Sequence, residues 1–404
     1  MPGRLIAKIW QHDPTIYAPP RYRRACSYSA FLPDRLASLP ADVVPLAVAG
    51  TVSDAERAIA QLNAIAQPAL APFARLLLRT ESIASSKVEG MQVDARTLAR
   101  AEARHDLGIK VGADAREVIA NIDAMQLAVE DASTAERLTI EHLVAVHRVL
   151  MAHAPNAQVA GRLRTDQNWI GGNDYNPCAA DFVPPPEEFL AELLDDLCTF
   201  CNRDEFPPIV QAAVAHAQFE TIHPYDDGNG RTGRALVQII LRRRGLAPSY
   251  LPPISVVLAA NRARYIEGLG WFRADRTADW IEQFASAAAR AATLAVRYLA
   301  ELDGLQERWR DQLRSSLAPR SDAAAWRLID VLPGHPVITV PVACAATQRS
   351  KVQIGKAVLQ LEGAGVLVPL HESARNRSWE AAGLLEILTS LESGDEGTGG
   401  QPRV

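Results

Sequence analysis

The chain has 404 residues, of which 48% are hydrophobic and 22% charged, and its formal net charge at pH 7 is −5. This length exceeds one ordinary hydrophobic core and predicts two or three domains. The composition is typical of a globular protein, and the charge excludes a general attraction to nucleic acid or anionic membranes. No apolar run approaches the roughly 20 residues of a transmembrane helix, and the first residues turn polar too early for a secretory signal. We therefore expect no membrane partner.

Five cysteines are scattered along the chain. Their odd number and wide spacing favour a reducing compartment, the cytoplasm. Cys198 and Cys201 form a single C-x-x-C pair inside a helical pattern. Without a second pair, the spacing disfavours a zinc or redox site.

The chain opens with residues 1–45, which are rich in proline and aromatic residues and are expected to be extended or loop-like. Helical spacing begins near Ser53, and one helix ends at Gly90. Residues 161–184 combine strand-forming residues with a Gly/Asn turn and predict a hairpin or an ordered loop. Further helices are predicted at 93–107, 113–131, 139–152, 187–203, 208–221 and 260–313.

The last part of the chain changes character at residue 321. Ser321 is a candidate N-cap for a helix through about Val331. A strand at 336–339, helices at 340–346 and 350–362, and strands at 366–370 and 377–379 are predicted to follow, an order that resembles a winged helix-turn-helix. DNA binding and protein contact both remain open for its polar and basic residues, which are Arg349, Lys351, Gln353, Lys356, Arg375 and Arg377. Residues 392–404 are glycine-rich and polar and should be disordered.

The most informative segment is residues 223–234, which read H-P-Y-D-D-G-N-G-R-T-G-R. Residues 231–244 have helical spacing and stop at Gly245. The Gly228-Asn229-Gly230 tripeptide would then lie at a helix N-terminus, where main-chain N–H groups and the helix dipole attract anions. The segment therefore predicts a phosphate-binding site.

The charged side chains of this segment suit the same chemistry. Arg231 and Arg234 are three residues apart, so they share a helix face and can donate to phosphate oxygens. Asp227 can supply one carboxylate to Mg²⁺. His223 precedes a proline, which predicts an extended segment, and its ordinary pKa suits a general base. We interpret Asp226 as a solvated turn residue.

Residues 223–234 resemble the signature of the Fic family, with Tyr225 in place of the family's Phe. The resemblance implies a mainly α fold: a Fic helical core with a small β-hairpin flap, followed by a C-terminal α+β winged helix-turn-helix. It implies an N-terminal helical region at 1–110 with an inhibitory helix at about 70–90. The catalytic core would span 111–300 and the winged-helix domain 315–385.

The implied activity is that of a protein adenylyltransferase, which transfers AMP from ATP to a Ser, Thr or Tyr hydroxyl of a target protein or of itself. His223 would be the catalytic base, and Asp227 would hold Mg²⁺ or Mn²⁺. For Tyr265, an aromatic that the family places beside the nucleotide base, core packing is the alternative. ATP would be bound by Asp227, Gly228, Asn229, Gly230, Arg231, Arg234 and Tyr265.

A second motif, from Ser85 to Gly90, resembles the family's inhibitory motif. Ser85 and Glu89 are four residues apart and share a helix face. We place Glu89 in the last helical turn, where the helix dipole disfavours a carboxylate. The resemblance implies that Glu89 pairs with Arg234 and keeps ATP in a non-productive pose, so the enzyme would be autoinhibited.

Residues 161–184 resemble the family's flap, which would align the target by β-augmentation through Trp169, Ile170 and Gly171. Core packing is equally open for Trp169, and His216 is interpreted as a buried structural histidine. Two other functions stay open. One is a Fic-fold transferase that uses another nucleotide donor or removes AMP. The other is a winged-helix transcriptional regulator whose core senses a nucleotide. The target, the modified residue type and the oligomeric state, a homodimer included, are left open.

Overall fold

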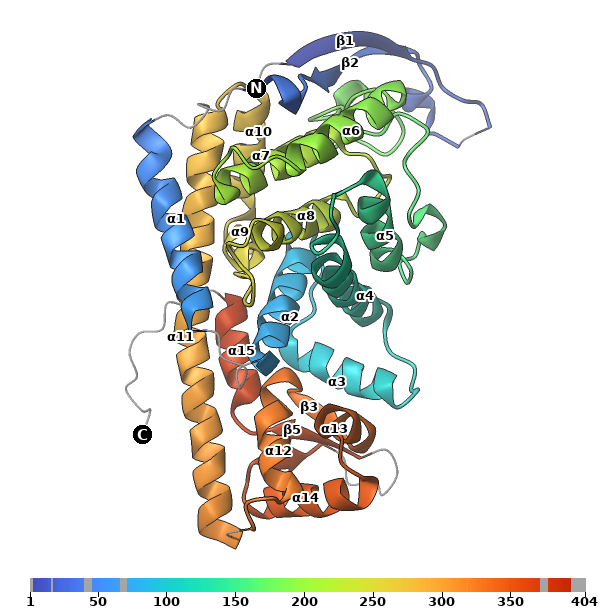
Figure 1. Ribbon diagram of the computed structural model, residues 1–404. Helices are drawn as coiled ribbons and strands as arrows, with labels where there is room; N and C mark the ends of the chain where they lie inside the picture. The colour runs from blue at the N-terminus through green and yellow to red at the C-terminus, as the bar shows by residue number, and fades with distance from the viewer. Residues whose placement is uncertain are drawn as a thin grey trace, which may run out of the picture. The chain divides into compact units, whose positions relative to one another are not determined.

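The computed structural model describes residues 3–15, 17–39, 46–65, 71–317, 319–370 and 377–393. Over these residues the protein is mainly helical with small antiparallel sheets, as expected (Figure 1). The chain forms two compact units, each gathered from three stretches. Unit 1 comprises Met1–Asp54, Leu127–Arg244 and Ala263–Ser286, and unit 2 comprises Ala55–Gln126, Gly245–Arg262 and Ala287–Val404.

Unit 1 contains the whole of the 223–234 segment. Its strands and helices are β1 (Gly3–Trp10), β2 (Cys26–Pro33), α5 (Ile140–Leu150), α6 (Leu190–Cys201), α7 (Pro208–Ile222), α8 (Asn229–Arg243) and most of α10 (Arg262–Arg273). Short turns are η1 (Pro20–Tyr22), η2 (Leu36–Ser38), the π-helical η4 (Ala128–Ala132), η5 (Ala157–Val159), η6 (Pro177–Ala179) and η7 (Glu187–Phe189). Helices α1 (Leu46–Ala64) and α11 (Thr277–Leu317) are divided between the two units.

Helix α7 is the central helix of unit 1, because every residue from Ile209 to Ile222 is buried. Helix α8 packs closely against it. Gly233 makes this approach possible: a Cβ atom there would lie 2.7 Å from Glu220 Oε1 and 3.0 Å from Phe219 Cδ1. The two helices therefore form a closely packed frame on either side of the loop that joins them.

The first residues of the chain form an antiparallel pair, with Gly3 opposite Pro33 and Trp10 opposite Cys26. The sequence predicted only extended or loop-like structure here, because the long connection between the strands carries no short hairpin turn signal. The ring of Trp10 meets that of Trp169 edge-on at 5.5 Å. The packing of β1 on a distant loop thus fixes a pairing that local sequence does not specify.

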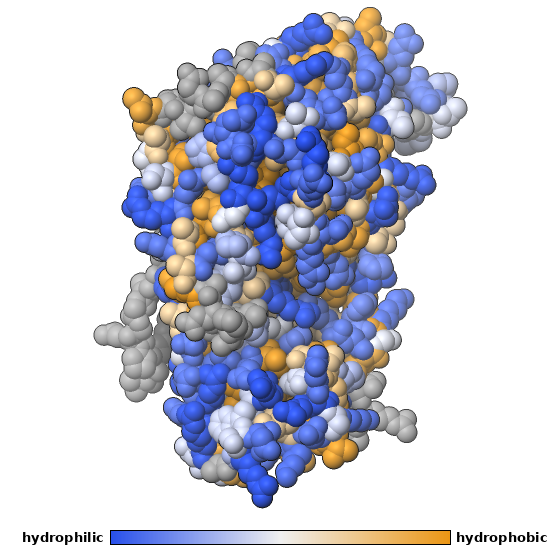
Figure 2. Space-filling model, in the orientation of Figure 1, coloured by the Kyte–Doolittle hydropathy of each residue, from blue (hydrophilic) through white to orange (hydrophobic). Residues whose placement is uncertain are grey.

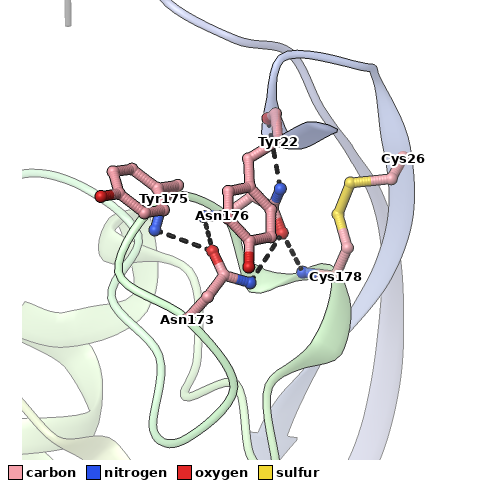
Figure 3. The surroundings of a disulfide bond; sticks show 6 residues. All are labelled: Tyr22, Cys26, Asn173, Tyr175, Asn176 and Cys178. Carbon is pink, nitrogen blue, oxygen red and sulfur yellow. Dashed lines mark hydrogen bonds between the residues drawn. A yellow bond between two sulfur atoms is a disulfide. The ribbon is translucent and has the colours of Figure 1, made fainter. Parts of the chain in front are cut away.

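A disulfide joins Cys26 of β2 to Cys178, with 6.1 Å between their Cα atoms (Figure 3). Beside it the rings of Tyr22 and Tyr175 stack at 5.1 Å, and Asn176 Nδ2 donates to the Tyr22 carbonyl at 3.2 Å. The hairpin is therefore tied to the 161–184 segment covalently and by polar contacts. Disulfides persist in oxidising compartments, so this bond gives no support to the reducing cytoplasm expected from the cysteine pattern.

Replacing Cys26 with Ser is expected to loosen the hairpin. The cross-link spans 152 residues, and closing so long a loop restricts the unfolded chain by an amount worth about 3–5 kcal/mol. Limited proteolysis with and without dithiothreitol checks this: reductant should speed cleavage of the hairpin in the wild type. With and without dithiothreitol, the Cys26→Ser protein should be cleaved as fast as the wild type is in the presence of dithiothreitol. Cys344→Ser is the matched control and should behave as wild type; equal rates for oxidised and reduced wild type would contradict the prediction.

Residues 161–184 form an ordered loop closed by a single antiparallel bridge between Ile170 and Phe182. Ile170 N donates to Phe182 O at 2.8 Å, and Asp181 N donates to Ile170 O at 2.9 Å. Of the two alternatives left by the sequence, the ordered loop is the one found. The expected β-hairpin flap is reduced to this bridge within the described residues, since the Gly171-Gly172 turn and η6 interrupt regular pairing.

Unit 2 contains the remaining elements: α2 (Ala71–Val88), α3 (Ala95–Asp106), α4 (Ala113–Leu127), α9 (Ile254–Ala260), α12 (Ala324–Val331), η8 (Leu332–Gly334), β3 (Val337–Thr339), α13 (Val340–Thr347), α14 (Lys351–Gly363), β4 (Leu367–Pro369), β5 (Ser378–Ala381) and α15 (Leu384–Ser393). Helix α2 buries polar side chains that find partners. Asn121 Nδ2 donates to Ser82 O at 2.7 Å and to Ser86 Oγ at 3.0 Å. The carboxylate of Glu81 accepts from the main-chain N–H and hydroxyl of Ser255.

The three C-terminal strands form a small antiparallel sheet in the order β3-β5-β4. Along the chain, these strands and the helices α12, α13 and α14 follow one another in the predicted order. The expected N-cap Ser321 is wrong, because α12 begins after Ala323 and no side chain caps it. Arg377 pairs with Glu362 at 3.1 Å, whereas Arg375 lies outside the described residues. Of the expected disordered tail, Glu392 and Ser393 are the last residues of α15, and residues 394–404 lie outside the described residues.

Cys198 and Cys201 are buried thiols, and burial raises the pKa of Cys198 to about 12. Among the described residues no cluster of His, Cys, Asp and Glu could hold a metal ion by itself. The same part of the chain has no helix long and apolar enough to cross a membrane. In the view of Figure 2 the surface is mainly hydrophilic and is broken by small hydrophobic areas.

Candidate active site

The catalytic candidate His223 is the residue at which α7 ends. It adopts the left-handed conformation, with φ 49° and ψ 60°, and its N–H donates to Phe219 O. The expectation of an extended segment is therefore wrong, although His223 does lie outside the helix. A left-handed backbone is uncommon for a side chain other than glycine and marks a position that surrounding structure must hold in place.

The loop after His223 is held closed by Asn229. Its side-chain Oδ1 accepts from Tyr225 N at 2.9 Å and its Nδ2 donates to Tyr225 O at 2.7 Å. Helix α8 begins at Asn229, so the Gly228–Gly230 stretch lies at a helix N-terminus, as predicted. The Asn229 side chain is thus used to shape the loop, and what the stretch can offer an anion is main-chain N–H groups.

Gly228 packs against His147 of α5 and against Met151, the residue after that helix. Its φ is +77°, and a Cβ atom there would lie 2.9 Å from Met151 Sδ and 3.2 Å from His147 Nε2. Glycine is therefore required both by backbone conformation and by space. The sequence indicated the glycine but not its contact with His147 and Met151, since His147 belongs to no recognisable motif.

His147 is fully buried and fixes the carbonyl of Asp227. Its Nδ1 accepts from Gly161 N at 3.0 Å, so Nε2 carries the proton and donates to Asp227 O at 2.9 Å. The ring stacks on Tyr225 at 3.7 Å and 9°. Burial lowers the pKa of His147 to about 4, so the ring is neutral near pH 7 and keeps both hydrogen bonds.

Asp227 lies two residues before the start of α8, and its side chain is 48% exposed. Oδ2 accepts from Asn156 Nδ2 at 3.2 Å, and Oδ1 lies 3.7 Å from Arg231 Nη2. A single half-exposed carboxylate does not make a resident metal centre. It does fit Mg²⁺, which commonly takes one or two carboxylates together with water and substrate phosphates.

Arg231 and Arg234 are both 2% exposed, and Arg231 Nη2 lies 3.8 Å from Met151 Sδ. Burying a guanidinium is costly unless it meets acceptors, and removal from water strengthens its attraction for a phosphate. The predicted pair of arginines therefore lies on a buried part of α8, in the same turns as the helix N-terminus. Asp226 is exposed, as predicted.

Arg164 and Asn168 are a second set that sequence reasoning missed. Arg164 is 3% exposed, and its Nε donates to His223 O at 2.9 Å. Asn168 Nδ2 donates to His223 O at 3.3 Å and to Tyr225 O at 3.0 Å. The main-chain N–H of Arg164 donates to Pro224 O at 3.0 Å. The loop bearing His223 is thus held from the start of the 161–184 segment, a link between residues far apart in sequence.

The three flap candidates lie on that same segment. Ile170 is 37% exposed and Gly171 is exposed, whereas Trp169 packs on Trp10 and its Nε1 donates to Asn173 O. Packing therefore accounts for Trp169. A role in target binding stays a prediction for all three.

Tyr265 is 4% exposed, and its hydroxyl lies 2.9 Å from His216 Nε2. Its ring lies among those of His216 and Trp280. This placement favours core packing, the alternative reading of Tyr265, over a contact with a nucleotide base. His216 is fully buried, as predicted.

The inhibitory candidates belong to unit 2. Ser85 is fully buried on α2, and Gly90 adopts φ +91°, the conformation of a helix stop. Glu89 is exposed and follows Val88, the last residue of α2, so it lies just beyond the last turn in which we had placed it. Arg262 Nε donates to Val88 O at 2.6 Å and so satisfies the end of this helix. Arg234 lies in unit 1, and its pairing with Glu89 stays a prediction.

Two parts of this chain match known protein families. Residues 137–241 match the Fic/DOC family, and residues 50–130 match the Fic/DOC family N-terminal region. The protein adenylyltransferase fic-1 of Caenorhabditis elegans is 33% identical over 137 residues, which cover 33% of this chain and 24% of that protein. The protein adenylyltransferase Fic of Drosophila erecta is 29% identical over 169 residues, which cover 40% of this chain and 32% of that protein. The matches thus span a third or less of these relatives.

Solved structures agree on the fold. A Fic family protein from Desulfovibrio desulfuricans G20 aligns with a TM-score of 0.53 at 20% identity, covering 85% of this chain and 98% of that one. A Fic domain containing signaling protein from Bacteroides thetaiotaomicron VPI-5482 aligns with a TM-score of 0.50 at 17% identity, covering 62% of this chain and 97% of that one.

Proposed function

Since the chain belongs to the Fic/DOC family through residues 50–130 and 137–241, we propose that it is a protein adenylyltransferase. It transfers AMP from ATP to a Ser, Thr or Tyr hydroxyl of a target protein or of itself. The observation that carries this is the loop between α7 and α8, which has an imidazole at one end and a helix N-terminus at the other. The curated relatives bear the name of this activity.

In the proposed mechanism, His223 takes the proton from the target hydroxyl as the oxygen attacks the α-phosphorus of ATP, and pyrophosphate leaves. Main-chain N–H groups of Gly228–Gly230 and the guanidinium of Arg231 bind the phosphates, and Arg234 binds the γ-phosphate. Charge that develops on the phosphate oxygens meets fixed donors in a partly dehydrated site, which is where such donors lower a barrier most. Catalysis is thus mainly positioning and electrostatic stabilisation.

Asp227 would hold Mg²⁺ or Mn²⁺ in company with the phosphates, and the ion would supply positive charge to their oxygens. The carboxylate itself is positioned by Asn156, while His147 fixes its main chain. These contacts orient the Asp227 carboxylate before a metal ion binds.

We further propose that Glu89 restrains the enzyme by competing with the γ-phosphate for Arg234. Support comes from the motif Ser85–Gly90, in which a helix stop presents an exposed carboxylate at the end of α2. A carboxylate that occupies this arginine would leave ATP bound in a non-productive pose.

Labelled ATP tests the activity. With ATP labelled at the α-phosphorus, the chain and proteins in a lysate should acquire label, and intact-mass spectrometry should show the mass of AMP. With ATP labelled at the γ-phosphorus, no label should be retained. Retention of γ-label would instead identify a phosphotransferase, and failure of both labels in an enzyme active toward AMP-modified protein would identify AMP removal.

A second candidate function is the binding of a protein or of DNA by the C-terminal elements, which we propose form a winged helix. The order α12-β3-α13-α14-β4-β5 and the three-stranded sheet support this. On α14, the exposed residues include Val352 (83%) and Leu359 (62%) beside Lys351 and Lys356. This mixture suits protein contact better than groove reading in DNA, where polar side chains meet base edges. A gel shift on the chain's own promoter across salt concentrations would reveal DNA binding by its salt dependence.

A further inference from the structure

The loop that carries His223 is held by donors from outside the motif. Arg164 spreads its donors over three parts of unit 1: Nε to His223 O at 2.9 Å, Nη1 to Asp166 O at 3.0 Å, and Nη2 to Pro185 O at 2.5 Å and Ile222 O at 3.4 Å. The guanidinium therefore bridges both ends of the 161–184 segment and the end of α7. Such a fork of fixed donors is available to arginine and not to lysine.

The held carbonyls are those that set the direction of the His223 side chain. His223 O accepts from both Arg164 Nε and Asn168 Nδ2, and the carbonyls on either side, of Ile222 and Pro224, accept from Arg164 as well. With φ at 49° the residue has an uncommon backbone conformation, which persists only when its surroundings over-determine it. The peptide planes that define this conformation are the ones that these donors hold.

A purely structural role is a poor explanation for the burial of the charged Arg164 side chain. Arg164 is 3% exposed, and burial lowers the pKa of its guanidinium to about 10, which leaves it charged at neutral pH. Its side chain meets four main-chain carbonyls. Acidic residues Glu187, Asp226 and Glu188 lie near enough to favour the charged form. Two of these four acceptors, Ile222 O and His223 O, belong to the chain segment that presents the imidazole.

We propose that Arg164, with Asn168, is the positioning residue for His223: it holds the imidazole in its reacting orientation and links that orientation to the 161–184 segment. The inference rests on the proposed function in taking His223 as the reacting group. A base displaced by a fraction of an ångström still allows ATP to bind, because the phosphate donors lie on α8. The expected defect is therefore in turnover and not in nucleotide affinity.

The test compares Arg164→Lys and Asn168→Ala with Arg162→Lys, whose side chain is exposed two residues away. We expect Arg164→Lys to lower kcat for AMP transfer by about tenfold or more, with KM for ATP and ATP affinity changed by no more than about twofold. Asn168→Ala should give a smaller fall of the same kind, and Arg162→Lys should match wild type. The inference is overturned if kcat per ATP-binding site is unchanged, or if KM and ATP affinity change as much as kcat.

A readout that needs no transfer separates this inference from the proposed function. The rate at which diethyl pyrocarbonate modifies His223, followed by peptide mass spectrometry, should differ between wild type and Arg164→Lys. The exposed His153 in the same protein is the internal reference and should react equally in both. If neither the wild type nor the Glu89→Gly protein transfers AMP, the proposed function fails, and an altered His223 rate still upholds the positioning role. Equal His223 rates in the two proteins reject it.

Discussion

His223→Ala is expected to lower AMP transfer by about 10²–10⁴-fold, because removing the proposed general base forfeits proton transfer in the transition state. In the proposed mechanism the phosphates meet donors on α8 and not the imidazole, so affinity for ATP should change little. Single-turnover transfer from ATP labelled at the α-phosphorus measures the first quantity, and equilibrium titration with a fluorescent ATP analogue measures the second.

His153→Ala is the control for the loss of a histidine, since His153 is exposed and lies outside the loop. It should retain wild-type transfer. Transfer by His223→Ala at the rate of this control would show that another group removes the proton. A parallel loss of ATP binding would instead show that the loop had collapsed, which Asn229 and Arg164 are expected to prevent.

Glu89→Gly should raise transfer of AMP to the chain itself. If Glu89 competes with the γ-phosphate for Arg234, its removal frees the arginine, and coupling between two such sites is commonly worth about 5–150-fold. Gly at this position adds no steric demand, because Glu89 is exposed and follows the last residue of α2. Intact-mass spectrometry after incubation with ATP and Mg²⁺ gives the fraction modified over time.

Glu136→Gly removes another exposed glutamate from a loop and should leave the rate unchanged. The double variant Glu89→Gly, His223→Ala should be inactive, which would tie the gain to the same site. A rate for Glu89→Gly equal to that of Glu136→Gly would reject the restraint. A gain that survives in the double variant would place the activity elsewhere.

Much of the secondary structure could be predicted, because helices such as α5 follow from apolar spacing and α2 ends just before the stop signal Gly90. The elements of the C-terminal part were also found in their predicted order, although the cap at Ser321 was not used. The pairing of β1 with β2 could not be predicted in this way. Its register is stabilised by contacts such as Trp10 on Trp169 and by the bond from Cys26 to Cys178.

Sequence by itself determined the segment 223–234, since a helix end, a glycine turn and a helix start joined by a few residues are close in space whatever surrounds them. It also determined that Arg231 and Arg234 share a helix with the N–H groups that we propose bind phosphate. Tertiary structure alone decided what holds these parts: Arg164 and Asn168 on His223, His147 beneath Asp227, and the core around Tyr265. Main-chain carbonyls look alike in every sequence, so which distant side chain donates to them is settled only when packing brings the two together.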